Sequence, residues 1–288
     1  IVFEKLSNGS LTLDDTFLVS EKAWKEREGS SMFVEVDKEI RVEDLLRGII
    51  VQSGNDACIV VAENISGSEK TFSILMNEMA SDIGLENTNF ANSTGMHNVK
   101  NYSTVSDIAK MSQYLINQYP EYYHLFSETE FEWSGISQKN RNPLLYKDIG
   151  ADGLKTGYLS ISGYGLAASA KNSNRRLIVV GHGFTSQQKR SQGTARLLNW
   201  GFREFTNINL YSKYSDVGIL PLSMASEDTV PLTTDKDIVI TVAKAKKDAI
   251  ETEIVPVDNL KAPFKQGDVV ALLKVMTVSY THLTLPTT

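Results

Sequence analysis

The stretch that decides the fold is Leu46-Arg47-Gly48-Ile49-Ile50-Val51-Gln52-Ser53-Gly54-Asn55-Asp56-Ala57-Cys58. It joins two apolar segments, Val42–Gln52 and Asp56–Ile65, whose hydrophobic residues recur with helical spacing. The polar Ser53 and Asn55 are therefore expected at a junction between two helices that pack into a core. A lone S-x-N tripeptide is more often a helix N-cap than a reactive pair, so the rest of the chain must decide between these interpretations.

A second polar motif, Lys155-Thr156-Gly157, lies in an expected strand further along the chain. Gly153–Thr156 and Gly163–Ala170 have the composition of strands, and we expect them to pair. Gly157 has no side chain to block a ligand backbone that pairs with its strand, the mode in which a bound peptide extends a sheet. On its own the tripeptide is a weak signal, since any strand can contain a lysine.

The other elements before Asn207 mix helical and strand patterns. Thr104 and Asp107 have the spacing of a capping box at the start of an expected helix. Lys171–Asn174 is a predicted hairpin turn. These patterns predict an α/β (α+β) body in which helices pack on a short antiparallel sheet. Its further elements are expected helices at Ser68–Ile83, Ser103–Asn117 and Gln188–Phe205 and an expected strand at Arg176–His182.

After Asn207 only strand patterns remain. Prolines separate short β runs at Asp237–Ala243, Ile250–Val255 and Asp268–Val275. We predict two domains, residues 1–206 and a small all-β sandwich over residues 207–277. Residues 278–288 have no helical or strand period and resemble the read-through translation of a sequencing adapter, with a natural disordered tail as the alternative.

Composition argues against several functional classes. The formal net charge is −6 and the isoelectric point is about 5.4, so we expect no nucleic-acid partner. The four histidines lack metal-ligand spacing, so we expect no metal site, and His182 is expected to pack in the body. The single cysteine, Cys58, forbids an internal disulfide and is expected to be a small buried hydrophobe. No apolar stretch approaches the roughly 18–20 residues of a membrane span.

The residues of the two motifs suit acyl transfer. This chemistry needs a nucleophile, a proton shuttle, an oxyanion hole and a group that holds a free carboxylate. Lys155 and Thr156 can hold the carboxylate of a substrate. Ser53 can relay a proton to a leaving amine, and Asn55 can orient the substrate amide. The backbone N–H of Tyr158 can serve as one oxyanion donor.

The nucleophile is the part that these motifs do not supply. Enzymes that combine the two motifs carry their reactive serine in an S-x-x-K sequence, expected upstream of both. No S-x-x-K occurs in residues 1–52, and Ser186-Gln187-Gln188-Lys189 follows the K-T-G motif, which is the wrong order. We therefore expect this polypeptide to lack the nucleophilic serine and its activating lysine, and to be inactive.

Longer phrases along the chain point to one family. Besides residues 46–58 they are Gly29-Ser30-Ser31-Met32-Phe33, Tyr102-Ser103-Thr104, Asn140-Arg141-Asn142-Pro143-Leu144-Leu145, Asp152-Gly153-Leu154-Lys155-Thr156-Gly157-Tyr158, Leu198-Asn199-Trp200-Gly201-Phe202-Arg203, Ala262-Pro263-Phe264 and Gly267-Asp268-Val269-Val270. With these phrases the chain, from Ile1 to about Thr277, resembles the low-molecular-mass penicillin-binding proteins that act as D-alanyl-D-alanine carboxypeptidases (peptidase family S11).

The resemblance implies a fold and a set of site residues. The first domain would be a penicillin-binding, β-lactamase-like transpeptidase domain, and the second would be the β-rich C-terminal domain of these enzymes. Arg141 becomes a candidate for the cleft rim, with a surface arginine that pairs with a helix end as the alternative. The resemblance implies catalytic roles for Ser53, Asn55 and Lys155. It implies substrate-binding roles for Thr156, Gly157 and Tyr158.

The implied activity is removal of the terminal D-Ala from peptidoglycan stem peptides through an acyl-enzyme, without a cofactor. β-Lactam antibiotics would be trapped as slowly hydrolysed acyl-enzymes. The implied location is periplasmic or otherwise extracytoplasmic. Family members carry the S-x-x-K just before the position of Ile1, so its absence is expected to reflect truncation. The C-terminal amphipathic membrane anchor of the parent enzyme is absent from the sequence as well.

Two other functions stay open at this point. A class A β-lactamase shares the logic of the three motifs, although such enzymes carry Asp where this chain has Gly54, and they lack a second β domain. A non-catalytic module that binds peptidoglycan through the same cleft is the alternative from a different class. The binding module is favoured if the gene sequence upstream of Ile1 also lacks an S-x-x-K motif, and we expect residues 1–288 to form no covalent adduct with a penicillin.

Overall fold

The computed structural model describes the chain except for residues 27, 222–228, 258–264, 266, 278–279 and 287–288. The backbone divides into two compact units, Ile1–Asn199 and Trp200–Thr288. The boundary falls inside the long helix α7 (Gln187–Glu204). Both sequence motifs lie in the first unit.

The segments with strong hydrophobic periodicity form the helices of the first unit. The helix predicted at Val42–Gln52 is α3 (Val42–Arg47), and a π-helical turn continues it to Gln52. The next predicted helix is α4 (Asn55–Ser66). Thr104 caps α6 (Val105–Gln118) by accepting a hydrogen bond from the Asp107 N–H, as predicted. The remaining helical elements are α1 (Val2–Ser7), α2 (Glu21–Lys25), α5 (Glu69–Asp82) and a 3₁₀ turn at Tyr123–Ser127.

A three-stranded antiparallel sheet forms the centre of this unit, with the order β5 (Ala151–Leu159), β6 (Gly163–Asn172), β7 (Arg175–Phe184). The predicted pairing is confirmed, because Gly157 lies opposite Gly165 and Tyr158 lies opposite Tyr164. Within the described residues β5 is an edge strand, so no strand pairs with its outer side. Sequence periodicity missed four short strands, β1 (Thr16–Leu18) paired with β2 (Glu39–Arg41), and β3 (Glu130–Trp133) paired with β4 (Ile136–Lys139).

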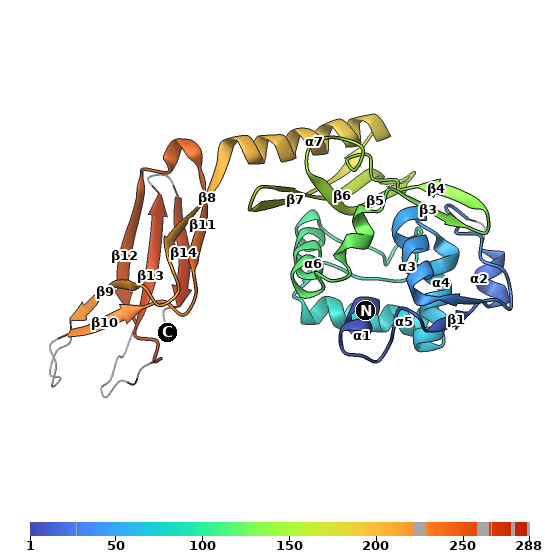
Figure 1. Cartoon of the computed structure of the whole chain (residues 1–288), viewed down its shortest axis with the longest axis horizontal. Helices are drawn as coiled ribbons and strands as arrows, with labels where there is room; N and C mark the ends of the chain where they lie inside the picture. The colour runs from blue at the N-terminus through green and yellow to red at the C-terminus, as the bar shows by residue number, and fades with distance from the viewer. Residues whose placement is uncertain (27, 222–228, 258–264, 266, 278–279, 287–288) are drawn as a thin grey trace. The chain divides into compact units, whose positions relative to one another are not determined.

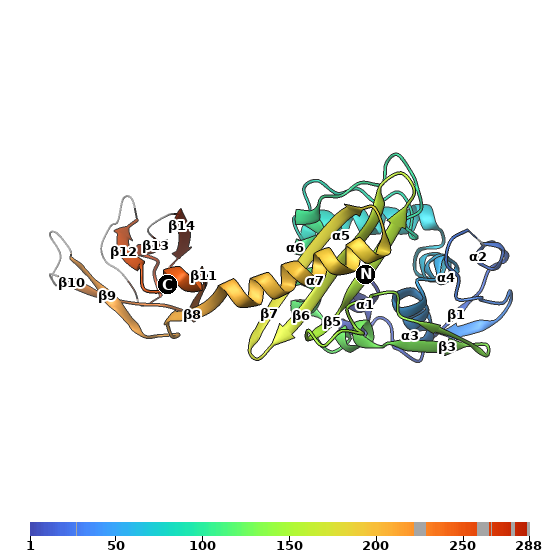
Figure 2. The same cartoon turned by 90° about the horizontal axis from the view of Figure 1, so that it is seen from above.

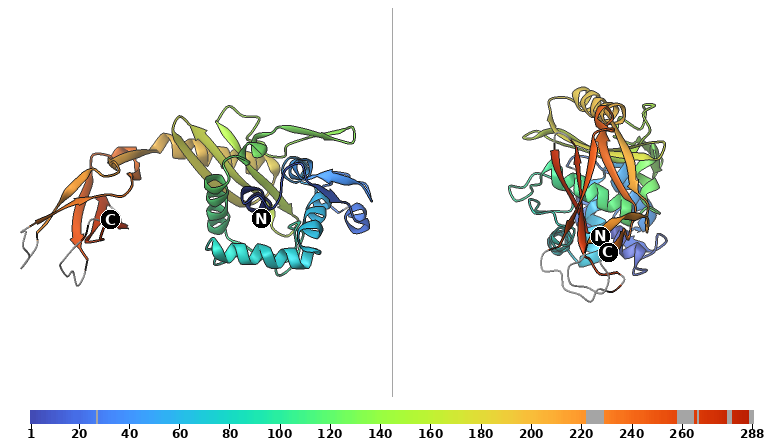
Figure 3. Two further views of the ribbon diagram at one scale, coloured as in Figure 1. Left: turned by 60° about the horizontal axis from the view of Figure 1, so that its bottom comes forward. Right: turned by 90° about the vertical axis from the view of Figure 1, so that its left-hand side faces the viewer.

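Helices cover both faces of the central sheet (Figures 1 and 2). The α7 helix runs along one face, where Gly193 approaches the ring of Phe184 so closely that an added Cβ would lie 2.7 Å from it. The α6 helix contacts β7 from the other side. On that side the α1 residue Phe3 packs its ring against Tyr119, Tyr122 and Phe126. The left view of Figure 3 shows the N-terminus inside this unit, between the sheet and α5.

The second unit is a small all-β domain, as predicted. Its two apolar clusters centre on Ile238, Ile240 and Leu273 and on Leu220 and Leu232. The strands pair as β8 with β11, β9 with β10, and β13 with both β12 and β14. Their bounds are β8 (Phe205–Tyr211), β9 (Asp216–Pro221), β10 (Thr229–Thr233), β11 (Ile238–Ala243), β12 (Ile250–Pro256), β13 (Ala271–Thr277) and β14 (Tyr280–Pro286).

The end of the chain differs from its sequence-based expectation. Strand β14 lies within residues 278–288, where the pattern predicts no regular structure. It pairs with the edge of β13 through the backbone, and such pairing does not require alternating side chains. The family-like phrase Ala262-Pro263-Phe264 lies outside the described residues. Among the helices of the described part, none is long and apolar enough to cross a membrane.

Candidate active site

The two sequence motifs meet in space, because the Lys155 ammonium donates a hydrogen bond to the Ser53 hydroxyl over 2.7 Å. Ser53 ends the π-helical turn with φ 61° and ψ 36°, the left-handed conformation. The following Gly54 N–H bonds back to the Gly48 carbonyl at 2.9 Å. This tight reversal between α3 and α4 turns the Ser53 side chain toward strand β5.

Asn55 is fixed by the loop that precedes β2. Its backbone N–H donates to the Ser30 carbonyl at 2.8 Å, and its side-chain amide donates to the Glu28 carbonyl at 2.9 Å. These bonds set the orientation of the carboxamide. No donor within the described part of the protein reaches its Oδ1, which is therefore available to the amide N–H of a ligand.

Asp56 holds that loop against the start of α4. Its buried carboxylate accepts hydrogen bonds from the backbone N–H groups of Met32, Phe33 and Val34 at 2.8, 2.8 and 3.1 Å. It also accepts from the Ser31 hydroxyl at 2.6 Å and from its own neighbour, the Ala57 N–H, at 2.9 Å. Sequence patterns gave no sign of this residue's role, because all but one of its partners are distant in the chain.

Gly54 has no room for a side chain. A Cβ at this position would lie 2.9 Å from the Met32 backbone nitrogen and 2.8 Å from the Asp56 carboxylate. Real Cβ atoms essentially never approach a neighbour this closely. An aspartate in the middle of the motif, as in class A β-lactamases, would therefore collide with the clamped loop.

We predict that Gly54→Ala lowers the free energy of unfolding by about 1–3 kcal/mol, the usual cost of overpacking. The backbone at Gly54 has φ −66°, which alanine adopts freely, so the cost comes from the collision alone. Gly157→Ala is the matched control, because a Cβ there meets open space, and we expect a change within about 0.5 kcal/mol. Urea unfolding of both variants checks the difference, and equal effects would contradict the packing argument.

Strand β5 presents the K-T-G residues along an open edge. Gly157 has open space beside it, and the exposed Tyr158 ring packs on Tyr164 with centroids 4.3 Å apart. The start of the strand is fixed by Asp152, whose carboxylate pairs with both terminal nitrogens of Arg176 at 2.7 Å. Tyr123 donates a further hydrogen bond to the same carboxylate at 2.9 Å. This network fixes the strand on which Lys155 is carried.

A cleft of about 910 Å³ joins these elements. Arg141, from the loop after β4, and Arg190, from α7, both line it. It therefore brings together all the site residues expected from the sequence, namely Ser53, Asn55, Arg141, Lys155, Thr156, Gly157 and Tyr158.

The cleft is cationic although the protein as a whole is acidic. Burial, reinforced by the charges of Arg141 and Arg190, lowers the pKa of Lys155 to about 8. Burial also lowers the pKa of each arginine. No carboxylate of the described residues forms an ion pair with any of the three cations, and no aspartate or glutamate lines the cleft. The site therefore favours an anionic ligand.

Arg190 is the residue that sequence reasoning missed. Its side chain is only 6% exposed, stacks over the Tyr164 ring at 5.7 Å, and leaves its Nε without a hydrogen-bond partner among the described residues. A buried arginine with an orphan donor is costly unless a ligand pairs with it. The only sequence signal was a basic residue on the inward face of an amphipathic helix.

Two other expectations are corrected. Cys58 is half-buried and lines the cleft, because it follows Asn55 by one helical turn on the same face of α4. Burial raises the pKa of its thiol to about 12. His182, expected to pack in the body, is exposed and also lines the cleft, because it lies near the open end of β7.

The Ser186-Gln187-Gln188-Lys189 sequence, which matches S-x-x-K but follows the K-T-G motif, has a structural role at the start of a helix. The Ser186 hydroxyl accepts a hydrogen bond from the Lys189 N–H at 3.1 Å, immediately before α7. This is the geometry of a helix N-cap, so the serine serves the helix terminus. Metal-ligand side chains, meanwhile, form no cluster of three or more in the described ranges.

Sequence comparison with known proteins matches both units of the chain to one family of enzymes. The sequence profile described as D-alanyl-D-alanine carboxypeptidase matches residues 1–185, and the profile described as penicillin-binding protein 5, C-terminal domain, matches residues 205–283. The curated D-alanyl-D-alanine carboxypeptidase DacA of Haemophilus influenzae is 35% identical over 94% of this chain and 70% of its own length. The first curated relatives extend further, since the chain spans between 65% and 70% of their lengths.

Solved structures give the same result. Penicillin-binding protein 5 from Haemophilus influenzae superposes with a TM-score of 0.92 at 33% identity, over 99% of this chain and 85% of the other. Penicillin-binding protein D2 from Listeria monocytogenes, solved in an ampicillin-bound form, is 26% identical with a TM-score of 0.62, over 70% of this chain and 82% of the other.

Proposed function

The chain belongs to the D-alanyl-D-alanine carboxypeptidase family of serine hydrolases, and from this premise we propose that its cleft binds the D-alanyl-D-alanine end of peptidoglycan stem peptides. The activity proposed for this site is release of the terminal D-Ala outside the cytoplasmic membrane. The observation that carries the proposal is the combination of an open strand edge with unpaired cations in one cleft.

The substrate peptide would lie antiparallel along β5, where Gly157 leaves room for its backbone. Its terminal carboxylate would accept hydrogen bonds from the Thr156 hydroxyl and from the orphan Nε of Arg190. Arg141 would add a second positive charge at the cleft wall. The Oδ1 of Asn55 would accept the N–H of the penultimate amide. Hydrogen bonds to a charged carboxylate contribute more to the binding free energy than hydrogen bonds between neutral groups do.

The chemistry would follow the usual course of acyl transfer. A serine hydroxyl attacks the penultimate D-Ala carbonyl while its proton passes to the activating lysine of its S-x-x-K motif, and the Tyr158 N–H stabilises the oxyanion of the tetrahedral intermediate. The C–N bond then breaks, and Ser53 passes a proton to the departing D-Ala amine and regains one from Lys155, which the 2.7 Å contact favours. Water subsequently hydrolyses the acyl-enzyme and releases the shortened peptide.

The attacking serine has no candidate within residues 1–288. Residues 1–52 contain no S-x-x-K, and Ser186 caps a helix. The polypeptide alone is therefore proposed to bind ligands without acylation. The same holds for β-lactams, whose binding is supported by the ampicillin-bound relative. A β-lactamase is disfavoured by the collision at Gly54, and a non-catalytic peptidoglycan-binding protein remains the second candidate because it would use the same cleft.

Equilibrium binding tests this proposal without requiring turnover. We expect acetyl-D-alanyl-D-alanine to bind the chain at least about tenfold more tightly than its C-terminal amide, because charged hydrogen bonds are lost with the carboxylate. Arg190→Met should remove this preference. Arg196→Met, an exposed arginine of the same helix, is the matched control and should retain it. Calorimetric titration measures each affinity.

Equal affinities for the acid and the amide would overturn the assignment of the cleft to D-alanyl-D-alanine ends. A fluorescent penicillin provides the complementary measurement. An adduct of the unaided chain that survives denaturation would contradict the absence of a nucleophile and would require another serine to be reactive.

A further inference from the structure

The cationic cleft holds more positive charge than the end of a D-alanyl-D-alanine peptide neutralises. That end carries one carboxylate, which the proposed function places on Thr156 and Arg190. Arg141 and Lys155 line the same cleft, and no carboxylate of the described residues pairs with either of them. Both cations would therefore stay without an anionic partner after such a ligand has bound. Because partly buried charge without a partner is costly, a ligand with a second anion would complement the cleft better.

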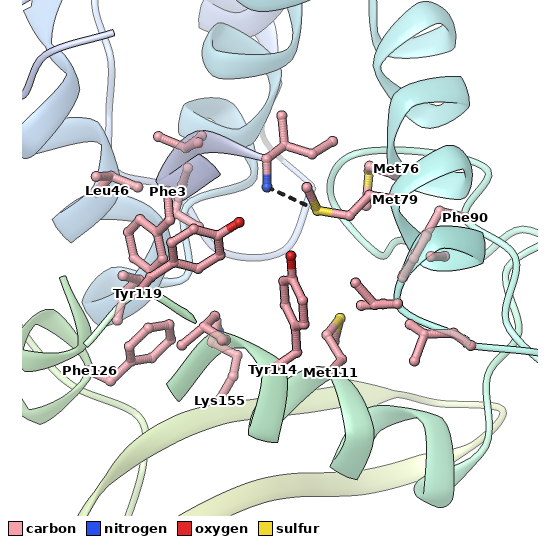
Figure 4. A pocket seen from close by; sticks show the side chains of 18 residues that line it. Phe3, Leu46, Met76, Met79, Phe90, Met111, Tyr114, Tyr119, Phe126 and Lys155 are labelled. Atoms are coloured by element: carbon pink, nitrogen blue, oxygen red, sulfur yellow. Dashed lines mark hydrogen bonds between the residues drawn. The ribbon is translucent and has the colours of Figure 1, made fainter. Parts of the chain in front are cut away.

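Lys155 finds no anionic partner on its other side either. It also lines a second cavity, of about 380 Å³, in the first unit (Figure 4). The side chains described around this cavity are apolar except for Lys155 itself and the hydroxyls of Tyr114 and Tyr119. A hydroxyl can accept a hydrogen bond, but it carries no charge that balances an ammonium. A compensating anion is therefore expected on the cleft side.

Arg141 is carried on a rigid support at the cleft wall. The flanking Asn140 and Asn142 are only 5% and 1% exposed. The Asn140 side chain donates to the Glu128 carbonyl at 2.8 Å and accepts from the Asn142 N–H at 2.9 Å, and the Asn142 side chain accepts from the Leu144 N–H at 3.1 Å. Arg141 itself is exposed, and no described residue accepts a hydrogen bond from its guanidinium. A free cation on a fixed backbone can bind a ligand at little cost in ordering.

The register of the peptide on β5 decides where a second anion can lie. The proposed acyl transfer places the penultimate carbonyl on the Tyr158 N–H, so the penultimate residue lies opposite Tyr158. Facing residues of antiparallel strands advance one for one, so the third residue from the C-terminus lies opposite Leu159. Leu159 and Ser162, at the turn between β5 and β6, still line the cleft. Since the last two residues are alanines, the third residue is the first whose side chain can bring a charge into the cleft.

We infer that Arg141 makes the cleft selective for stem peptides whose third residue from the C-terminus carries a side-chain carboxylate. The inference rests on the proposed function, which sets the position of the D-alanyl-D-alanine end. The charge of Arg141 acts across the cleft, because it contributes to the lowered pKa of Lys155. A second carboxylate would be attracted by both cations, whereas an ammonium at the same place would be repelled by both.

The main alternative is a third residue with a free ammonium that lies on the exposed ring of Tyr158. An aromatic face attracts such a cation. Here, however, the Tyr158 ring stacks on Tyr164 at 4.3 Å, and the Arg190 guanidinium already lies 5.7 Å from the centre of the Tyr164 ring. A second cation on this pair of rings would face the charge of Arg190 as well as that of Arg141. We therefore expect an ammonium to bind more weakly than a neutral side chain, and a carboxylate more tightly.

Three peptides that differ in one side chain test the inference with the full chain. They are acetyl-glutamyl-, acetyl-glutaminyl- and acetyl-lysyl-D-alanyl-D-alanine. Glutamate and glutamine have nearly the same shape, so the ratio of their affinities reports the charge. At an ionic strength of about 10 mM, where the Debye length is about 30 Å, the glutamyl peptide should bind at least about threefold more tightly than the glutaminyl peptide. The lysyl peptide should bind at least about twofold more weakly than the glutaminyl peptide.

Calorimetric titration measures the three affinities. Equal affinities, or tightest binding of the lysyl peptide, would overturn the inference.

Variants assign the selectivity to Arg141. Arg141→Met should lower the ratio of glutamyl to glutaminyl affinity at least about twofold, whereas Arg141→Lys keeps the charge and should retain most of the ratio. Arg196→Met is the matched control, because it removes the same net charge from an exposed position of α7 and should leave the ratio unchanged. A ratio that survives Arg141→Met, or that falls equally in Arg196→Met, would overturn the assignment.

Salt distinguishes attraction through space from a difference in fit. At an ionic strength of about 1 M the Debye length is about 3 Å, so the ratio of glutamyl to glutaminyl affinity should approach one. A preference that arises from shape would be unaffected by salt. A ratio that stays constant from low to high salt would therefore contradict the role given to the charge of Arg141.

The outcomes also separate this inference from the proposed function. If acetyl-D-alanyl-D-alanine binds more tightly than its C-terminal amide while the three longer peptides bind equally, the proposed function stands and the selectivity is refuted. If none of these acids binds more tightly than its own C-terminal amide, the proposed function itself fails, and the selectivity fails with it.

Discussion

Replacing Asp56 with alanine is expected to lower the free energy of unfolding by about 3–5 kcal/mol. The carboxylate is 1% exposed and accepts hydrogen bonds from four backbone N–H groups and one hydroxyl. Its removal would leave several buried donors unpaired, each at a cost of about 1–3 kcal/mol before relaxation. Urea unfolding of the variant measures the change.

The same substitution should also weaken ligand binding, because the clamped loop holds Asn55 through the Glu28 and Ser30 carbonyls. Asp56→Asn should not rescue either property, since an amide nitrogen would face N–H donors where the second carboxylate oxygen now accepts. Asp14→Ala, which removes an exposed carboxylate paired with Arg41, is the control and should change stability by less than about 0.5 kcal/mol. A loss below about 1 kcal/mol for Asp56→Ala would contradict the clamp.

The contrast between Asp56 and the motif residues explains how far the sequence could predict this site. Ser53 and Lys155 belong to short motifs whose spacing and chemistry are specific, so their meeting could be expected from the sequence alone. Asp56 binds a loop that precedes it by more than twenty residues and has no periodicity. A contact between an irregular loop and a helix start leaves no local pattern, so only the fold reveals it.

Secondary-structure elements with a local sequence pattern could likewise be predicted, whereas those without one could not. The α4 and α6 helices have apolar faces or caps that a sequence pattern identifies, and both form near their expected bounds. The β1 and β3 strands are three and four residues long, too short for alternation to be recognised. Arg190 was missed for a different reason. Its burial depends on how α7 packs against Tyr164, a tertiary contact that the amphipathic pattern of the helix does not encode.

Lys155→Met is expected to stabilise the fold while weakening the binding of a ligand carboxylate. Burial lowers the pKa of this lysine from 10.5 to about 8, so keeping it charged at pH 7 costs up to about 3 kcal/mol at 1.36 kcal/mol per unit. Loss of the hydrogen bond to Ser53 offsets about 1 kcal/mol of that gain. We therefore expect a net stabilisation of about 2 kcal/mol at neutral pH, together with loss of the preference for a ligand carboxylate.

The sign of the pH dependence follows from the lowered pKa. Below about pH 8 the lysine is protonated in both the folded and the unfolded state, so the full penalty is present and the advantage of Lys155→Met is constant. Between about pH 8 and 10.5 the unfolded state binds more protons than the folded state, so the wild type gains stability with rising pH. The advantage of the variant should therefore shrink across this window. Urea unfolding of both proteins at several pH values gives the difference, from which other titrating groups largely cancel.

The wild type should gain stability as the pH rises above about 8, whereas its affinity for a ligand carboxylate should fall over the same range. The positive charge of the protonated lysine adds to the attraction of the cleft for the carboxylate that Thr156 and Arg190 would bind, so the affinity for acetyl-D-alanyl-D-alanine should fall as the pH rises through about 8 and the free site loses its proton. Lys139→Met, at an exposed position of β4, is the matched control and should leave both the stability profile and the affinity unchanged. A destabilised Lys155→Met protein, or an affinity that stays flat through pH 8, would mean that the lysine is not held in the strained charged state on which anion binding in this cleft depends.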